Sequence, residues 1–192
     1  MLILGLNHGE IDSSASILKN SKIIASSGEE RFSRIKKTKS FPQNAINFCL
    51  KSANIDLNQC DYIAQGWNPG EYWNFFNYSS ISDKRIRRED YLFSIPDNLF
   101  NFIKRKPPEW LLLDSPQNSQ LPPIYFVRHH LAHAANAFFL SPYNEAAILT
   151  CDWRGEFQTT TMGKGIGNSI EIFSTNNVPH SLGMFYATFT EL

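Results

Sequence analysis

The sequence predicts an α/β fold built from a duplicated unit, and two observations lead to this prediction. Short apolar segments of strand length alternate with amphipathic segments of helix length along much of the 192 residues. In addition, a strand and turn near the N-terminus have a counterpart near the C-terminus, where Gly155-Glu156 aligns with Gly9-Glu10.

The first three predicted elements are strands. Residues 2–7 form a short apolar run that is closed by polar turn residues, and residues 14–18 alternate small and apolar side chains. Asn20-Ser21 is typical of a hairpin turn, and it leads into a third strand at residues 22–27. The three segments therefore predict an antiparallel meander.

Helices and further strands follow. After Pro42, an amphipathic helix is indicated by apolar side chains at helical spacing, namely Ile46, Cys49, Leu50 and Ala53. Strands are predicted at residues 62–65 and 124–127, and a helix from about His130 to Leu140. The order β-β-β-α-β-α-β-α is that of the ribonuclease-H-like half of an actin-like fold.

The repeat predicts where a second lobe begins. A strand at residues 148–152 leads through Gly155-Glu156 to a Ser/Thr-rich strand, a turn at Gly167-Asn168 and a strand at 169–174. An apolar helix is expected at 181–192. We therefore predict a first lobe over residues 1–143 and the start of a truncated second lobe over 144–192, with an aromatic and proline-rich insertion at about 66–123. A chance match of two ordinary hairpins is the alternative.

Bulk composition narrows the range of partners. The formal net charge is zero, so no overall field attracts the chain to nucleic acid or to an anionic membrane. Three widely spaced cysteines favour a reducing compartment, and we expect a cytoplasmic protein. Basic and aromatic residues interleave in the insertion, but acidic neighbours favour a solvated segment over a nucleic-acid surface.

The segment from Val127 to Phe139 holds the sharpest candidate site. On a helix, His129 and His133 lie one turn apart on the same face and could bind one metal ion. His130 with His133 is the alternative pair. Asp152, at the end of the next strand, is the candidate third ligand, which gives two imidazoles and one carboxylate with open positions for substrate.

Two other places carry charge that could act on a substrate. Asp12 follows the first strand and could orient a nucleotide or a hydroxyl, although a turn residue that bonds its own backbone would look the same. The charge run at residues 29–39 reads as a solvated loop, or alternatively as an arm that neutralises phosphate.

Five motifs in order resemble the O-carbamoyltransferase family that includes nodulation protein U and the antibiotic-tailoring carbamoyltransferases. The motifs are Ile3-Leu-Gly-Leu-Asn7 with Asp12-Ser-Ser-Ala15, Glu29-Glu-Arg-Phe-Ser-Arg-Ile-Lys36 with Phe41-Pro42, His129-His-Leu-Ala-His-Ala-Ala-Asn-Ala-Phe-Phe-Leu-Ser-Pro142, Asp152-Trp-Arg-Gly-Glu156 and Pro179-His-Ser-Leu-Gly183. The resemblance covers essentially the whole chain. It implies an N-terminal domain akin to the tRNA threonylcarbamoyl transferases, with an actin-like fold.

The resemblance also implies a chemistry. The family domain transfers carbamoyl from carbamoyl-adenylate to a hydroxyl of a small-molecule acceptor, and a following domain makes the adenylate from carbamoyl phosphate and ATP. His129, His133 and Asp152 match the ligands of a divalent metal, for which we expect iron, with zinc as the alternative. Lys36 and Asp12 match positions that line the nucleotide and carbamoyl site, and Gly155 lies in a turn expected to contact the cofactor.

Two departures from the family pattern leave alternatives open. Ile11 stands where the family commonly has histidine, and a further metal-binding aspartate and the adenylating domain would lie beyond Leu192. The chain could therefore be a nucleotide- or metal-binding fragment that catalyses nothing without its missing half or a partner. A tRNA-modifying role is disfavoured by the neutral charge, and an actin-like kinase would leave the paired histidines without a function.

Overall fold

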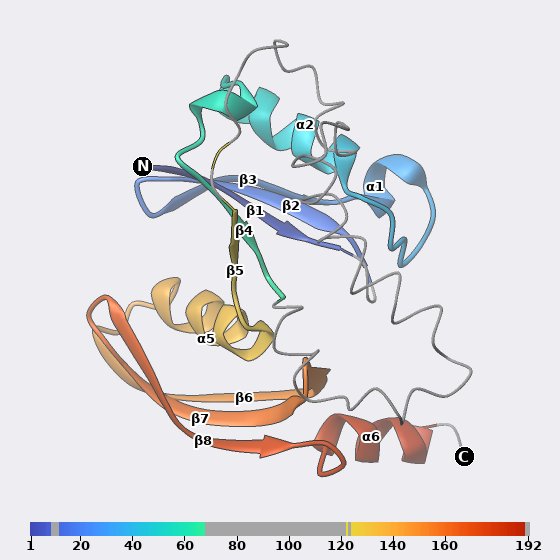
Figure 1. The fold of residues 1–192 in the computed structure, drawn as a ribbon, viewed down its shortest axis with the longest axis vertical. Helices are drawn as coiled ribbons and strands as arrows, with labels where there is room; N and C mark the ends of the chain where they lie inside the picture. The colour runs from blue at the N-terminus through green and yellow to red at the C-terminus, as the bar shows by residue number, and fades with distance from the viewer. Residues whose placement is uncertain (9–11, 68–121, 123, 191–192) are drawn as a thin grey trace, which may run out of the picture. The chain divides into compact units, whose positions relative to one another are not determined.

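A computed structural model describes residues 1–8, 12–67, 122 and 124–190 of the chain. The described residues up to Phe126 belong to one compact unit and those from Val127 onward to a second. Each unit contains its own sheet, and Figure 1 labels the elements. None of the helices in the described part of the chain has the length and apolar character needed to cross a membrane.

A five-stranded sheet in the order β3-β2-β1-β4-β5 forms the frame of the first unit. Its strands are β1 (Leu2–Asn7), β2 (Ser14–Lys19), β3 (Lys22–Gly28), β4 (Tyr62–Gln65) and β5 (Ile124–Phe126). The first three are antiparallel neighbours, whereas β4 and β5 run parallel to β1. The β2–β3 hairpin closes through Asn20 and Ser21, both with positive φ, as a tight hairpin turn requires.

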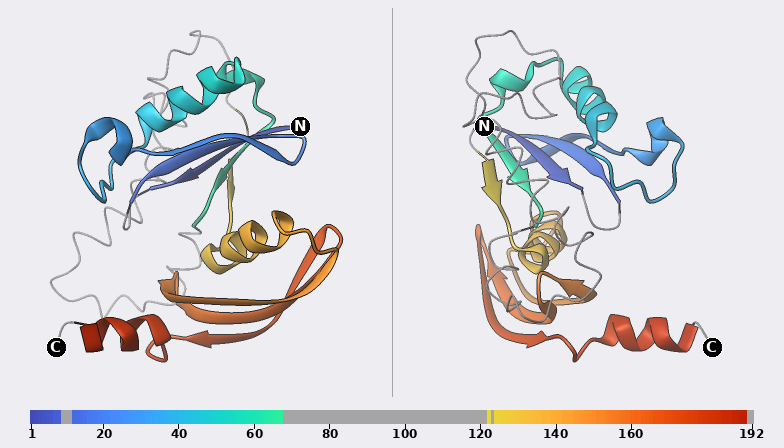
Figure 2. Two further views of the ribbon diagram at one scale, coloured as in Figure 1. Left: turned by 180° about the vertical axis from the view of Figure 1, so that it is seen from behind. Right: turned by 45° about the vertical axis from the view of Figure 1, so that its right-hand side comes forward.

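Helices cover one face of this sheet. The helical elements are α1 (Glu30–Ser33), α2 (Gln43–Ala53) and the 3-10 turn η1 (Leu57–Gln59). Helix α2 lies across β2 and β3 (Figure 2) and buries its apolar stripe there. The stripe comprises Ala45, Ile46, Cys49 and Leu50, which meet Leu4, Ile17 and Ile63 of the sheet. Burial of this face confirms the helix predicted after Pro42.

The charge run at residues 29–39 is only partly solvated. Glu29 is 3% exposed, and its carboxylate accepts hydrogen bonds from the Ala45 N–H at 2.8 Å and from Asn44 Nδ2 at 2.6 Å. It therefore caps the N-terminus of α2, where Pro42 offers no side-chain acceptor. Lys36 and the other cations of the run are exposed. The expectation of a wholly solvated loop is wrong for Glu29, because a helix start recruits its carboxylate.

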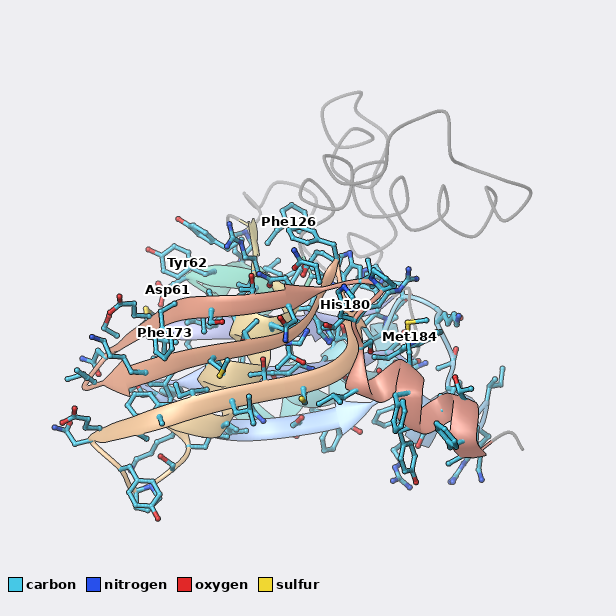
Figure 3. The ribbon with its side chains drawn as sticks, turned by 90° about the horizontal axis from the view of Figure 1, so that it is seen from below. Asp61, Tyr62, Phe126, Phe173, His180 and Met184 are labelled. Carbon is cyan, nitrogen blue, oxygen red and sulfur yellow. The ribbon has the colours of Figure 1, made fainter. Side chains whose placement is uncertain are left out.

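The second unit places one helix on a three-stranded antiparallel sheet. Its elements are α5 (His129–Phe139), β6 (Glu145–Gly155), β7 (Gln158–Ile166), β8 (Ser169–Asn177) and α6 (Leu182–Thr190). The strand order is β6-β7-β8, and α5 packs on one face through Ala134, Phe138 and Ile148. Figure 3 views this unit from its other side, where Phe173 and Met184 are labelled and exposed.

The observed architecture confirms the predicted fold class. The first sheet has the strand order and directions of a ribonuclease-H-like, actin-like lobe, and β6-β7-β8 repeats its initial antiparallel meander. The second hairpin turns at Gly167, whose φ is +57°, as expected. The turn residues Gly9-Glu10 and nearly all of the 66–123 insertion, including any helix between β4 and β5, lie outside the described residues. The division at 143/144 stays a prediction.

Candidate metal centre

Helix α5 presents two neighbouring stripes of side chains to its surroundings. His130, Ala134 and Phe138 recur at a spacing of four and are buried against the sheet. His129 and His133 form the adjacent stripe, also one turn apart. In strand β6, every second side chain faces α5. Ile148 and Thr150 lie on this face, and Asp152 follows two positions later on the same face. The local periodicities therefore bring Asp152 to the two histidines.

The three predicted metal ligands meet at one point. His129 Nε2 lies 2.8 Å from Asp152 Oδ2, His133 Nε2 lies 3.2 Å from the same oxygen, and the two Nε2 atoms lie 2.9 Å apart. The other carboxylate oxygen, Oδ1, accepts the Trp153 N–H at 2.6 Å, which fixes the plane of the carboxylate. The His133 side chain is 50% exposed, so one side of the triangle is open to solvent.

Hydrogen bonds alone cannot account for all three short contacts among His129 Nε2, His133 Nε2 and Asp152 Oδ2. An imidazole nitrogen carries either a proton or a lone pair, never both, so it either donates or accepts. If both Nε2 atoms donate to Asp152, the two N–H groups face each other at 2.9 Å. If one Nε2 accepts from the other, its lone pair faces the carboxylate oxygen. With the carboxylate ionised and both imidazoles neutral, one of the three contacts is therefore repulsive in every arrangement of the protons.

A cation resolves the same triangle. Three lone pairs then point to a common centre, and atoms about 2.1 Å from a metal in neighbouring octahedral positions lie about 3.0 Å from one another. The observed separations of 2.8, 2.9 and 3.2 Å match that value. Two imidazoles and one carboxylate gathered at one point are the donor set of non-haem iron(II) sites. The residues present therefore fit a divalent metal.

The electrostatics favour the charged form of the carboxylate. Hydrogen bonds from His129 and then His133 lower the pKa of Asp152 well below its usual range, more than burial raises it. The carboxylate is therefore ionised at neutral pH. An ionised carboxylate is the form that a metal binds.

His130 makes different contacts from its two neighbouring histidines. Its ring is 1% exposed; Nε2 lies 3.1 Å from the Gln158 carbonyl oxygen and Nδ1 lies 2.6 Å from Thr150 Oγ1. A carbonyl only accepts, so Nε2 carries the proton and Nδ1 accepts from Thr150. Thr161 in turn lies 2.6 Å from Thr150. His130 thus anchors α5 to the sheet and is not one of the three clustered donors.

Gly155 lies against the first histidine. A Cβ atom at this position would come within 2.5 Å of the His129 side chain, so only glycine permits the observed approach. Glu156, the next residue, is 1% exposed, and both of its carboxylate oxygens accept the His129 N–H, at 3.1 and 3.2 Å. The structure thus places Gly155, predicted to contact a cofactor, in contact with a candidate ligand.

The remaining predicted site residues belong to the first unit. Asp12 is exposed, and its Oδ1 accepts a hydrogen bond from Asn7 Nδ2 at 3.1 Å. Lys36 is exposed in the segment between α1 and α2. Their roles at a nucleotide site stay predictions.

Sequence reasoning missed Glu156 as a residue that touches the site. The signal was present in part, since Gly155-Glu156 was recognised as a repeated turn. The long-range contact to α5 was not visible, because nothing in a pattern of spacing tells a turn carboxylate from one that turns inward to cap a helix. The sequence favoured His129 with His133 and kept His130 with His133 as an alternative, and the contacts of His130 with the sheet became visible only with the register of α5 on β6.

The chain is similar in sequence to a known protein family and to individual relatives. A family model described as the carbamoyltransferase N-terminus matches residues 2–192. The chain is 36% identical to the uncharacterised protein sll1178 of Synechocystis, over 98% of this chain and 31% of that protein. It is 29% identical to nodulation protein NolNO of Sinorhizobium fredii, over 91% of this chain and 24% of that protein. The chain thus spans about a quarter to a third of the length of these relatives.

The chain is also similar to proteins of known structure. YeaZ from Pseudomonas aeruginosa superposes with a TM-score of 0.45 at 14% identity, covering 93% of this chain and 68% of that one. The activator of 2-hydroxyisocaproyl-CoA dehydratase from Clostridium difficile gives a TM-score of 0.42 at 14% identity, covering 100% of this chain and 53% of that one. The match of the family model over almost every residue, with the ordered motifs described above, shows that this chain belongs to the carbamoyltransferase family and carries its N-terminal domain.

Proposed function

We propose that this chain is the N-terminal part of an O-carbamoyltransferase that binds a divalent metal through His129, His133 and Asp152. The proposed reaction moves a carbamoyl group from carbamoyl-adenylate to a hydroxyl of a small-molecule acceptor. Family membership supports carbamoyl transfer in general. The observation that carries the metal site is the triangle of donor atoms, whose three short contacts protons alone do not satisfy.

The transfer has a simple balance of bonds. The acceptor oxygen forms a bond to the carbamoyl carbon, the bond from that carbon to the adenylate phosphate oxygen breaks, and AMP leaves. The acceptor proton must pass to a base. When bound, a divalent metal supplies Lewis acidity and a fixed template for an oxygen ligand.

The side chains have separate assignments in this proposal. His129, His133 and Asp152 hold the cation, with Asp152 supplying the one negative charge among the three donors. Lys36, matched through the resemblance, is assigned to the phosphate of the leaving AMP, whose charge a lysine ammonium can neutralise. Asp12 is assigned to orient the nucleotide or to accept the proton. The turn at Gly155 is assigned to contact with the nucleotide.

The test begins with metal content. The chain is purified without oxygen, and iron and zinc are counted by mass spectrometry in the wild type and in His133→Ala. We expect near-stoichiometric metal in the wild type and its loss in the variant, since two donors hold a divalent ion far less tightly than three. Equal metal in both proteins, or none in either, contradicts the metal site.

The second stage tests transfer. Carbamoyl-adenylate is generated from carbamoyl phosphate and ATP by the adenylating domain of a carbamoyltransferase relative, and AMP and carbamoylated acceptor are measured with hydroxyl-bearing sugars. Product that depends on His133 supports the proposal. A metal-loaded chain that yields no product with any acceptor supports the alternative of a non-catalytic fragment. The cytoplasmic location and the absence of nucleic-acid and membrane partners stay predictions.

A further inference from the structure

We propose that Glu156 is a positioning residue of the candidate metal centre: its buried carboxylate fixes the first turn of α5 and thereby sets how tightly the triad binds a divalent cation. The inference rests on the metal-binding part of the proposed function. It assigns to Glu156 a role at the metal site that neither spacing nor family membership supplies.

The contact between Glu156 and His129 is long-range in sequence and involves both carboxylate oxygens. Both carboxylate oxygens of Glu156 accept the backbone N–H of His129, at 3.1 and 3.2 Å, from 27 positions further along the chain. Helix α5 begins at His129, and its N-cap residue, Arg128, makes no side-chain capping bond. A helix start leaves its first amides without intrahelical partners and carries partial positive charge. Glu156 therefore supplies the acceptor and the negative charge that the local sequence does not.

The backbone at Glu156 indicates that its side chain matters. Its φ is +43°, in the left-handed region that is unfavourable for any residue with a Cβ. Glycine or asparagine would adopt this turn more readily. What glutamate adds is a carboxylate that reaches inward from the β6–β7 turn, where it is 1% exposed.

The capped residue is itself a ligand. The N–H of His129 meets Glu156, its ring lies on Gly155 and its Nε2 lies 2.8 Å from Asp152. Backbone, ring and ligand atom are therefore all located by the segment 152–156. If the Glu156 carboxylate is removed, the His129 N–H loses its acceptor, and one of the contacts that orient the His129 ring is lost. Removing a group that orients a metal ligand typically weakens metal binding 10- to 100-fold.

The first unit offers a matched control. Glu29 is also a buried carboxylate, 3% exposed, that accepts a backbone N–H at the start of a helix, in its case Ala45 of α2 at 2.8 Å. Both carboxylates cap a helix start, so the loss of either should lower stability. Only Glu156 contacts a candidate metal ligand, so only its loss should change metal binding.

The experiment uses Co²⁺ as the probe, because its visible absorption bands report ligand geometry directly. Affinity is measured by competition with a chelating dye for the wild type, Glu156→Gly, Glu156→Gln and Glu29→Ala. Glycine removes the carboxylate without strain at positive φ, and glutamine keeps an acceptor without the charge. We expect at least tenfold weaker binding and shifted bands for Glu156→Gly, binding within about threefold of the wild type for Glu156→Gln, and no change for Glu29→Ala.

The outcomes are distinct. Wild-type affinity and spectrum in Glu156→Gly overturn the inference, as does an equal loss in Glu29→Ala, which would mark a general effect of stability. A wild-type chain that binds no Co²⁺ overturns the proposed function itself. If Glu156→Gly does not fold, Glu156→Asp decides, since it keeps the charge but withdraws it from the His129 amide by one methylene. The same tenfold loss is expected there, and unchanged affinity overturns the inference.

Discussion

At the scale of single residues, Gly155 yields a sharp prediction. In Gly155→Ala the new Cβ would lie 2.5 Å from the His129 side chain, so the ring must shift. We expect a loss of about 1–3 kcal/mol of unfolding free energy, as for other overpacked sites, and a loss of metal. Urea denaturation and metal content measure both. The control is Gly167→Ala, which also replaces a glycine but has no atom within 4 Å of its Cβ; it should keep its metal.

His8 gives a prediction about pH. Burial lowers its pKa to about 4, and its ring makes an edge-to-face contact with Phe41. The unfolded chain takes up the proton near pH 6.5 and the folded chain only near pH 4, so the stabilisation is present above pH 6.5 and is lost as the pH falls through that window.

Removing the titrating group should flatten this pH dependence. Between pH 7 and pH 5, the wild type should lose about 2 kcal/mol through His8 alone, and His8→Asn should lose correspondingly less. Urea unfolding at the two pH values makes the comparison. An unchanged difference between them would show that His8 is not the responsible group.

At the scale of elements, the packing of α5 on its sheet depends on the chain of polar groups from His130 through Thr150 to Thr161. In Thr150→Val, His130 Nδ1 loses its donor inside the unit. A buried acceptor without a partner costs about 1–3 kcal/mol. Urea denaturation should show this loss. Thr160→Val, whose hydroxyl makes a long 3.5 Å contact with Cys151 Sγ, should change stability much less.

The elements themselves were largely predictable. Strand patterns, the Asn20-Ser21 turn and the apolar stripe of α2 are local signals, so β1 to β3 and α2 appear at or close to the expected residues. The features that the sequence did not predict are contacts between residues far apart in the chain. The carboxylates of Glu29 and Glu156 turn inward to cap helices 15 or more residues away in sequence. No periodicity encodes such a contact, because it arises only when two elements have docked.

Part of the candidate site was predictable because two of its residues are close in sequence. His129 and His133 share a helix, so their spacing alone brings them together. Asp152 required one further assumption, that the strand after α5 packs directly against it. The exclusion of His130 needed the register between α5 and β6, which depends on how Phe138 and Ala134 fit against the sheet.

At the scale of the whole molecule, the position of the triad on two elements has a consequence beyond chemistry. His129 and His133 belong to α5, whereas Asp152 belongs to β6, 19 positions beyond His133. An ion held by all three would cross-link helix to strand, so that binding energy becomes resistance to unfolding of the second unit alone. Amide hydrogen exchange should then slow throughout α5 and β6 when Co²⁺ is added and recover with a chelator, while α2 exchanges at an unchanged rate. A second unit that unfolds less often with the ion bound would also be cut less often by proteases, so metal supply would lengthen the lifetime of the domain.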